Sequence, residues 1–121
     1  MEKYPLTNAQ KRIWYAQKKY GANPVFNIGG RVLIKGSTNL DLLARSFQIL
    51  IEQNDILRVR LYEENGEVFQ TVHEESRHID IIDFSDFEDA VQRCESWCDI
   101  KAKEPFAMTG LPLYFICVFK L

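Results

Sequence analysis

Two histidines and three cysteines are the candidates in this chain for moving a proton near neutral pH or binding a transition metal. An imidazole with a pKa of about 6.5 is suited to general-base catalysis. His73 and His78 are isolated from each other, however, and we predict that both lie at the surface. No serine is flanked by glycines in the pattern of a nucleophile elbow. Spacing alone therefore identifies no catalytic residue.

The cysteines are odd in number and have no paired spacing, which fits reduced thiols better than a disulfide framework. Cys94 and Cys98 are one helical turn apart, so a metal pair completed by a histidine is conceivable. The usual spacing of a structural zinc site is absent. Thiols that pack as small hydrophobic side chains are the favoured interpretation, and we predict no metal site.

The segment that must position the functional residues runs from Asn39 to Val72. Apolar residues after Asn39, a plausible N-cap, recur at the spacing of one helical face. The period then changes to alternation, which places Arg58 and Arg60 on the same face of a strand. Asn65-Gly66 follows and is the strongest short-range signal for a β-hairpin. The predicted elements are a helix over Leu40–Gln53 and strands over Leu57–Tyr62 and Glu67–Val72.

Local signals also predict the other elements. Thr7 and Gln10 have the spacing of a capping box, and Ser85-Asp86 is predicted to cap a later helix. Gly29-Gly30 lacks the third glycine and the following helix of a dinucleotide-binding fingerprint, so a bulge or a close backbone approach is favoured. The predicted helices are Thr7–Tyr20 and Asp86–Lys103, and the predicted strands are Phe26–Ile34, His78–Asp83 and Leu113–Lys120.

These elements predict an α+β fold with three helices packed on a mixed β-sheet. The apolar positions that face the sheet define the expected core. We expect it to include Ile13, Trp14, Phe47, Ile51, Leu57, Val91, Trp97 and Phe115.

Length and charge exclude several classes of protein. The 121 residues form one domain or part of one. A net charge of -2 argues against a nucleic-acid-binding protein, which needs a basic face. The longest apolar run, Leu111–Phe119, is shorter than the roughly 20 residues of a transmembrane helix, and the N-terminus lacks the apolar core of a signal peptide. We therefore expect a cytoplasmic protein that contacts neither nucleic acid nor membrane.

Two short runs carry a more specific pattern. The run Thr7–Trp14 resembles the first signature of the condensation domains of nonribosomal peptide synthetases, Ser-x-Ala-Gln-x-Arg-Leu/Met-Trp. The run Gln53–Leu61 resembles their second signature, Arg-His-Glu-x-Leu-Arg-Thr-x-Phe, with Asp55 in place of Glu and Leu61 in place of Phe. The residues that match outright are Ala9, Gln10, Arg12 and Trp14 in the first run and Leu57 and Arg58 in the second.

Each match also has a structural interpretation. Ala9 and Trp14 can be part of a core-facing helix stripe, and Arg58 can be a solvated strand residue. Two motifs in the right order and spacing, however, favour the family. Phe26-Asn27-Ile28 and Gly110-Leu111-Pro112-Leu113 also resemble it, so the likeness covers nearly the whole chain.

The resemblance implies the N-terminal part of a chloramphenicol-acetyltransferase-like lobe, with residues 1–121 as a single partial domain. It implies amide-bond formation between aminoacyl or peptidyl thioesters on phosphopantetheine arms of carrier domains, with no cofactor bound directly. The family's catalytic motif, His-His-x-x-x-Asp-Gly, is absent from residues 1–121, so we expect no catalytic residue and no activity in this chain alone. The alternatives are an epimerisation, heterocyclisation or other acyltransferase relative, and a non-catalytic interaction module.

Two expectations follow for the isolated chain. An apolar strand edge beside Leu113–Phe119 would favour self-association of the fragment. The resemblance implies that Arg58 serves a structural role and pairs with the Asp of the histidine motif that residues 1–121 do not contain. A buried guanidinium needs such a partner, so Arg58 is expected to be either solvated or paired with a carboxylate inside this chain.

Overall fold

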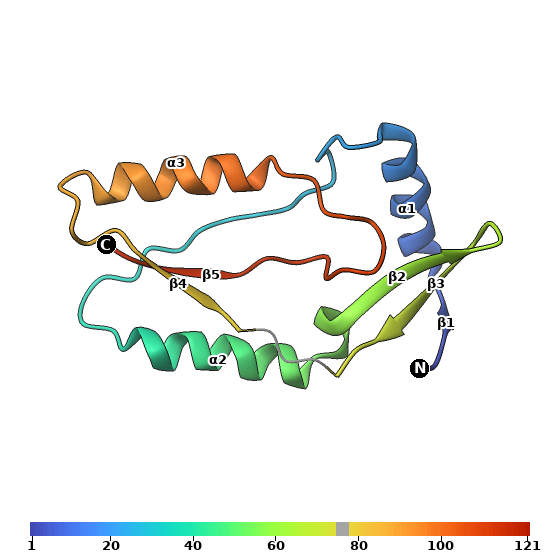
Figure 1. The fold of residues 1–121 in the computed structure, drawn as a ribbon, viewed down its shortest axis with the longest axis horizontal. Coiled ribbons are helices and arrows are strands. Elements are labelled where there is room, and N and C mark those ends of the chain that lie inside the picture. The colour runs from blue at the N-terminus through green and yellow to red at the C-terminus, as the bar shows by residue number, and fades with distance from the viewer. Residues whose placement is uncertain (75–77) are drawn as a thin grey trace.

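The computed structural model describes residues 1–74 and 78–121 and shows an α+β fold with three α-helices (Figure 1). The expected fold class is confirmed, although the strands divide between two small sheets. In chain order the elements are β1 Tyr4–Pro5, α1 Asn8–Tyr20, α2 Leu40–Gln53, the 3₁₀ turn η1 Asp55–Arg58, β2 Val59–Glu64, β3 Glu67–Val72, β4 Asp80–Asp83, α3 Ala90–Ala102 and β5 Cys117–Lys120.

The first sheet is antiparallel, with the order β1-β3-β2. Its hairpin turns at Asn65 and Gly66, which both have positive φ, 52° and 79°. Such a turn has the twist that joins two antiparallel strands directly, and it places Glu64 opposite Glu67. The predicted hairpin is therefore confirmed. The two-residue strand β1, which pairs with β3, carries no alternation in the sequence and was not predicted.

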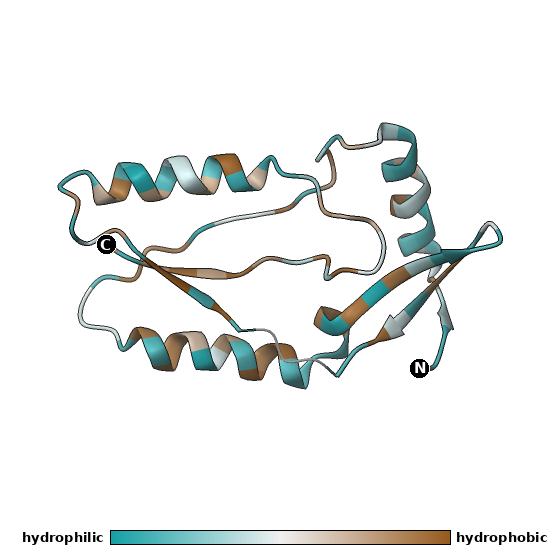
Figure 2. Ribbon diagram, viewed as in Figure 1, coloured by the Kyte–Doolittle hydropathy of each residue, from teal (hydrophilic) through white to brown (hydrophobic). Residues whose placement is uncertain are grey.

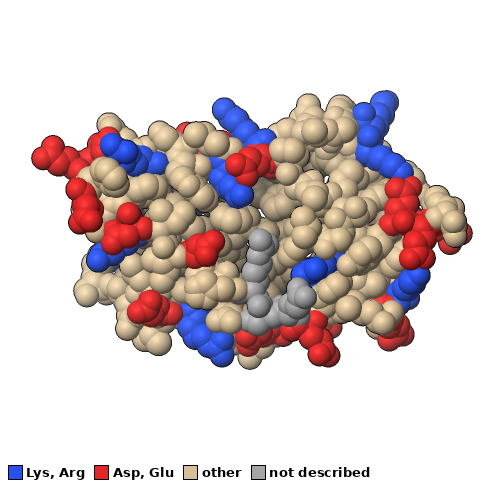
Figure 3. All heavy atoms as spheres, viewed as in Figure 1, with Lys and Arg blue, Asp and Glu red and all other residues tan. Residues whose placement is uncertain are grey.

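Helix α1 packs on one face of this sheet. Thr7 and Gln10 form the predicted capping box, with each side chain bonded to the other's main-chain N–H. Trp14 is buried against Leu6 and Leu61, and this core is extended by partly buried neighbours: Val59, Val68 and Met108. Two exposed ion pairs, Lys3–Glu64 and Lys18–Glu63, connect the tip of the hairpin to the N-terminal segment and to α1. Charges of both signs therefore lie together at that end of the molecule (Figure 3).

The second sheet is the parallel pair β4–β5, which lies between α2 and α3 (Figure 1). Val118 packs with Ile51 of α2 and Ile79, while the next residue, Phe119, faces Trp97 of α3 with ring centroids 5.2 Å apart. Because side chains alternate along a strand, the two helices cover opposite faces of β5. Brown, apolar positions on α2, β4 and β5 mark these contacts in Figure 2.

The prediction of a strand over Phe26–Ile34 is wrong. This segment runs beside α3 without joining a ladder in the described part of the chain. Side chains hold it instead. The Asn27 amide donates to the carbonyl oxygens of Ala102 and Glu104 at the end of α3, at 3.2 and 2.8 Å. Arg31 pairs with Asp99 at 3.2 Å. The segment therefore docks on a helix end, with polar side chains in place of main-chain hydrogen bonds.

Several predicted boundaries also shift; strand β4, for example, begins at Asp80 and not at His78. Helix α3 begins at Ala90 and not at Asp86, because Ser85 bonds the Asp83 carboxylate through both its N–H and its hydroxyl and the chain turns at Phe84–Phe87. Strand β2 begins at Val59 because the 3₁₀ turn occupies the two residues before it. Strand β5 begins at Cys117, four residues later than predicted for Leu113.

The expected core is correct only in part. Trp14 and Ile51 are buried, and Phe47, Leu57 and Trp97 are half-buried. Ile13, Val91 and Phe115 are exposed, so their inclusion in the core was wrong. Ile13 and Val91 lie at the margin of an apolar helix stripe, where a small rotation of the helix decides which side chain meets the sheet, and Phe115 lies before the start of β5.

Candidate functional site

The corner between α2 and β2 is built by Asn54. Its main-chain N–H bonds the Ile51 carbonyl and its side-chain amide bonds the Leu50 carbonyl at 2.7 Å, which satisfies the last turn of α2. The Asn54 carbonyl in turn accepts the Leu57 N–H and starts the 3₁₀ turn. Leu57 packs beside Ile51 in the second core, so the end of the turn is anchored.

Arg58 leaves this turn with its side chain only 14% exposed. Its Nη2 lies 2.5 Å from an Asp55 carboxylate oxygen, and its Nη1 donates to the His73 carbonyl oxygen at 2.8 Å. Its Nε is buried and has no hydrogen-bond partner among the residues that the structure describes. Of the two expected outcomes for Arg58, the structure shows the second: a carboxylate inside the chain, supplied by the second signature itself.

The residues of the first signature have different environments. Gln10 closes the capping box and also donates from Nε2 to Gln70 of β3 at 2.9 Å. Trp14 is buried, whereas Ala9 and Arg12 are exposed. Gln10 and Trp14 therefore attach α1 to the sheet, and Ala9 and Arg12 face outward.

The two signatures lie on opposite faces of the first sheet. Leu61 packs against Trp14 on the α1 face. Arg58 and Arg60 precede Leu61 at odd spacings, so they belong to the other face. That other face carries a series of polar and aromatic side chains. We call it the arginine face, and its members are Arg58, Arg60, Tyr62, Phe69, Thr71 and His73.

Comparison with known proteins identifies the family of this chain. The model of the condensation domain matches residues 1–121, the whole chain. This chain belongs to the condensation domain family. The predicted resemblance is confirmed, and the chain is part of a family of acyltransferase domains found in synthetases of secondary metabolites.

Its relatives include large peptide synthetases. The chain is 35% identical to surfactin synthase subunit 1 of Bacillus subtilis (strain 168), over 97% of this chain and 3% of that protein. It is 28% identical to gramicidin S synthase 2 of Brevibacillus brevis, over 99% of this chain and 3% of that protein. The chain thus spans a small fraction of the relatives that it matches.

Solved condensation domains share the fold. The starter condensation domain of rhizomide synthetase superposes with a TM-score of 0.88 at 23% identity, covering 99% of this chain and 29% of the solved one. The first condensation domain of the calcium-dependent antibiotic synthetase gives a TM-score of 0.85 at 20% identity, over 99% of this chain and 30% of that one. At these identities the likeness establishes the fold.

His73 is a member of the arginine face, and its prediction as a surface residue was wrong. It is half-buried, and its Nε2 lies 3.2 Å from the Tyr62 hydroxyl and 3.1 Å from the Thr71 hydroxyl. His78, by contrast, is exposed as predicted. The signal that distinguishes them is the register of the hairpin, which places His73 opposite Arg58.

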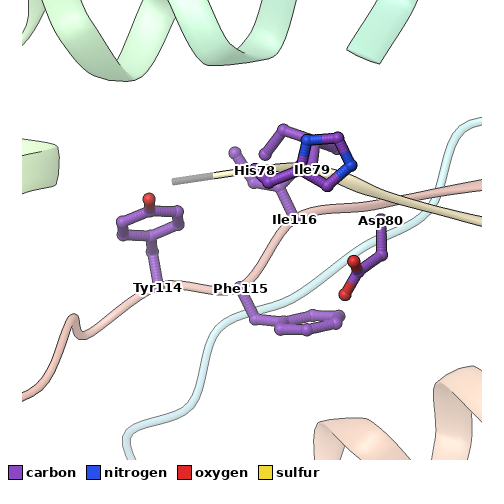
Figure 4. Close-up of a pocket in the computed structure, with 6 residues that line it drawn as sticks. All are labelled: His78, Ile79, Asp80, Tyr114, Phe115 and Ile116. Atoms are coloured by element: carbon purple, nitrogen blue, oxygen red, sulfur yellow. The ribbon is translucent and has the colours of Figure 1, made fainter. Parts of the chain in front are cut away.

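A small hollow lies at the start of β4, lined by His78–Asp80 and Tyr114–Ile116 (Figure 4). In the close-up the Asp80 carboxylate points toward Phe115, away from the His78 ring. The hollow has a volume of about 30 Å³, which is room for one water molecule and not for an aminoacyl group. Within residues 1–74 and 78–121, therefore, the arginine face is the better candidate site.

Cys94 and Cys98 lie on α3 and Cys117 begins β5, and all three are free thiols. Burial raises the pKa of Cys94, and the neighbouring Cys98 thiol adds to that rise. No group of three or more His, Cys, Asp or Glu side chains in the described ranges has the arrangement of a metal site. In those same ranges no helix has the length and apolar character needed to cross a membrane.

Cys117 provides a pH-dependent prediction. Burial raises the pKa of its thiol to about 11, with Asp80 adding to the rise. We expect its alkylation by iodoacetamide to increase with pH up to about 11 in the folded chain, because the thiolate is the nucleophile. Peptide-resolved mass spectrometry after timed alkylation measures this rate.

The matched control is the same chain unfolded in urea, where the midpoint should return to about 8.5. Since the folded pKa is the higher one, the stability contributed by the neutral thiol is present below about pH 8.5 and is lost as the pH rises toward 11. Identical midpoints in the folded and unfolded chains would contradict burial of Cys117.

Proposed function

We propose that this chain is the N-terminal portion of a nonribosomal peptide synthetase condensation domain that forms amide bonds between carrier-bound aminoacyl or peptidyl thioesters. The observation that carries the proposal is the match of the condensation domain along all 121 residues. In this reaction the acceptor amine nitrogen attacks the donor thioester carbonyl. The C–N bond forms, the C–S bond breaks, and the pantetheine thiol leaves with the proton that the amine gives up.

The exposed apolar surface supports a partial domain. Solved condensation domains match 98% to 99% of this chain, but the chain covers only 27% to 30% of them. Those solved chains are therefore more than three times longer. Large apolar side chains lie open along the extended segment and before β5: Ile28, Val32, Leu33, Ile34, Leu111 and Leu113. A surface of this kind marks an interface. We propose that the remainder of the domain covers it.

The role that we assign to residues 1–121 is to build the site and not to transfer the proton. The two histidines are not adjacent, and His73 is bonded within the arginine face. Arg58 keeps one buried donor, Nε, without an acceptor in the described part of the chain. The resemblance assigns that acceptor to the Asp of the family's histidine motif, and we adopt this assignment. Arg58, Asp55 and Leu57 are then structural residues next to the active site, and Ala9, Gln10, Arg12 and Trp14 belong to the supporting helix.

The partners follow from the same proposal. The substrates are carried by phosphopantetheine arms of peptidyl carrier domains, and the chain itself binds no cofactor. The relatives are large peptide synthetases of which this chain matches only a few per cent, which supports carrier domains and the other synthetase domains as partners.

A chimera tests this proposal. Residues 1–121 replace the matching stretch of the condensation domain of surfactin synthase subunit 1, and the product from carrier-bound thioesters is measured by mass spectrometry. The chimera is expected to form the amide, whereas residues 1–121 alone are expected to form none above background. The mass of the product also separates amide formation from heterocyclisation, which loses a further water.

Two controls make this assay specific. A chimera with Arg58→Ala should lose most of its activity, and one with Lys11→Ala, at an exposed position of α1 that is not among the matching signature residues, should retain it. Product from the 121-residue chain alone, or a folded chimera without product, would count against the proposal.

A further inference from the structure

Arg58 and His73 form the first pair beyond the regular β2–β3 ladder, which ends at Val59 opposite Val72. The His73 N–H donates to the Arg58 carbonyl at 3.0 Å. Opposite residues in an antiparallel ladder commonly exchange two such bonds. Here the bond to the His73 carbonyl comes from the Arg58 guanidinium, at 2.8 Å. The 3₁₀ turn thus ends the ladder, and the arginine side chain occupies the place of a main-chain donor.

The His73 side chain is anchored on the same face. Its Nε2 lies 3.2 Å from the Tyr62 hydroxyl and 3.1 Å from the Thr71 hydroxyl. Its ring stacks on Tyr62 with centroids 6.2 Å apart and planes 23° apart, and Tyr62 stacks in turn on Phe69. Thr71 is buried. Two hydroxyls and a stacked ring therefore fix the imidazole, and with it the main chain of His73.

Of the two contacts that hold the Arg58 guanidinium, the bond to the His73 carbonyl is firmer than the pair with Asp55. The Asp55 carboxylate is 77% exposed, and a pair open to water stabilises one geometry only weakly. The His73 carbonyl contact is partly buried. A long arginine side chain loses considerable rotamer freedom when it is fixed, so a rigid acceptor on the strand is needed to hold its direction.

We propose that His73 is a positioning residue that orients Arg58. Its anchored imidazole fixes the carbonyl that receives Nη1, and the guanidinium is thereby held with Nε–H directed at an oxygen acceptor beyond the described residues. A carboxylate fits this donor best, because a charge-assisted bond offsets the burial of the cation. The importance of this arrangement for amide formation rests on the proposed function, whereas the arrangement itself does not.

The test is hydrogen exchange at the Arg58 Nε–H, followed by ¹⁵N NMR in residues 1–121. His73→Leu introduces an apolar side chain and removes both hydroxyl contacts, so the exchange of the Arg58 Nε–H is expected to accelerate roughly tenfold. His73→Gln introduces an amide that can reach the Tyr62 or Thr71 hydroxyl, and we expect slow exchange in this variant. The matched control is His78→Leu at the other, exposed histidine, which should leave the rate unchanged.

A second variant keeps the test decisive if His73→Leu fails to fold. Thr71→Val preserves shape, removes one hydroxyl, and should accelerate the exchange less than His73→Leu. Global unfolding is measured on every variant by urea denaturation, because a merely structural histidine would change the unfolding free energy and leave the local exchange of Arg58 as it was. Unchanged exchange in both His73→Leu and Thr71→Val overturns the inference.

This readout is independent of catalysis. An inert chimera together with His73-dependent exchange would reject the proposed function and keep His73 as the residue that orients Arg58. An active chimera together with exchange that does not depend on His73 would support the proposed function and reject His73 as the residue that orients Arg58.

Discussion

Replacing Trp14 by alanine is expected to lower the free energy of unfolding by about 3 to 5 kcal/mol. Trp14 is 4% exposed and forms the first core with Leu6 and Leu61. Because that core contains few buried side chains, removing its largest member leaves a cavity that α1 cannot close without leaving the sheet. Urea denaturation followed by circular dichroism measures the change.

The neighbouring residue supplies the control. Ile13 is 53% exposed on the same helix, and Ile13→Ala is expected to change stability by less than about 1 kcal/mol. Since a domain is stable by only about 5 to 15 kcal/mol, Trp14→Phe provides a milder variant if Trp14→Ala does not fold. Comparable losses for Trp14→Ala and Ile13→Ala would contradict the orientation of α1.

The second large effect is expected at Ile51. Its side chain is 1% exposed and joins α2 to the parallel sheet through Ile79 and Val118. Ile51→Ala is expected to cost about 2 to 5 kcal/mol, since it removes buried methyl groups from the place where three elements meet. The measurement is again the midpoint and slope of the urea transition.

Ile28 provides a control with the same side chain in the opposite environment, since it is 99% exposed. Ile28→Ala is therefore expected to be nearly neutral in the 121-residue chain. Ile51→Val should fall between the two, at about 0.5 to 1.5 kcal/mol. A neutral Ile51→Ala would show that α2 does not depend on the sheet for its stability.

The features that the sequence predicted well are those that neighbouring residues decide. Thr7 and Gln10 cap α1 reciprocally, Asn39 accepts the Leu42 N–H at the start of α2, and Asn65-Gly66 turns the hairpin. Each of these depends on residues three or fewer positions apart. Partners distant in the sequence are not needed, so local chemistry was sufficient.

The strand predicted over Phe26–Ile34 failed for the opposite reason. Its apolar residues suit an extended chain, and the segment is extended. Whether an extended segment becomes a strand depends on a neighbour with free main-chain groups, which no local pattern specifies. Here the neighbour in the described structure is the end of α3, and Asn27 and Arg31 form the contacts.

The candidate site shows both situations. Sequence motifs identified Arg58 and Asp55, but their pairing depends on the 3₁₀ turn, which the predicted strand start at Leu57 concealed. His73 was within reach of the sequence. A two-residue turn at Asn65-Gly66 fixes the register of the hairpin, and counting back from Glu64 opposite Glu67 places His73 opposite Arg58.

The contact between Asn27 and the end of α3 also sets an order of events during biosynthesis. Asn27 precedes the two carbonyls that it caps by 75 and 77 residues. Ribosomes add about 5 to 20 residues per second, so roughly 4 to 15 seconds separate the synthesis of Asn27 from that of its acceptors. Trp14 meets Leu61 well before then. On the ribosome, α1 and the hairpin can therefore assemble first, while the extended segment remains undocked until the end of α3 has emerged.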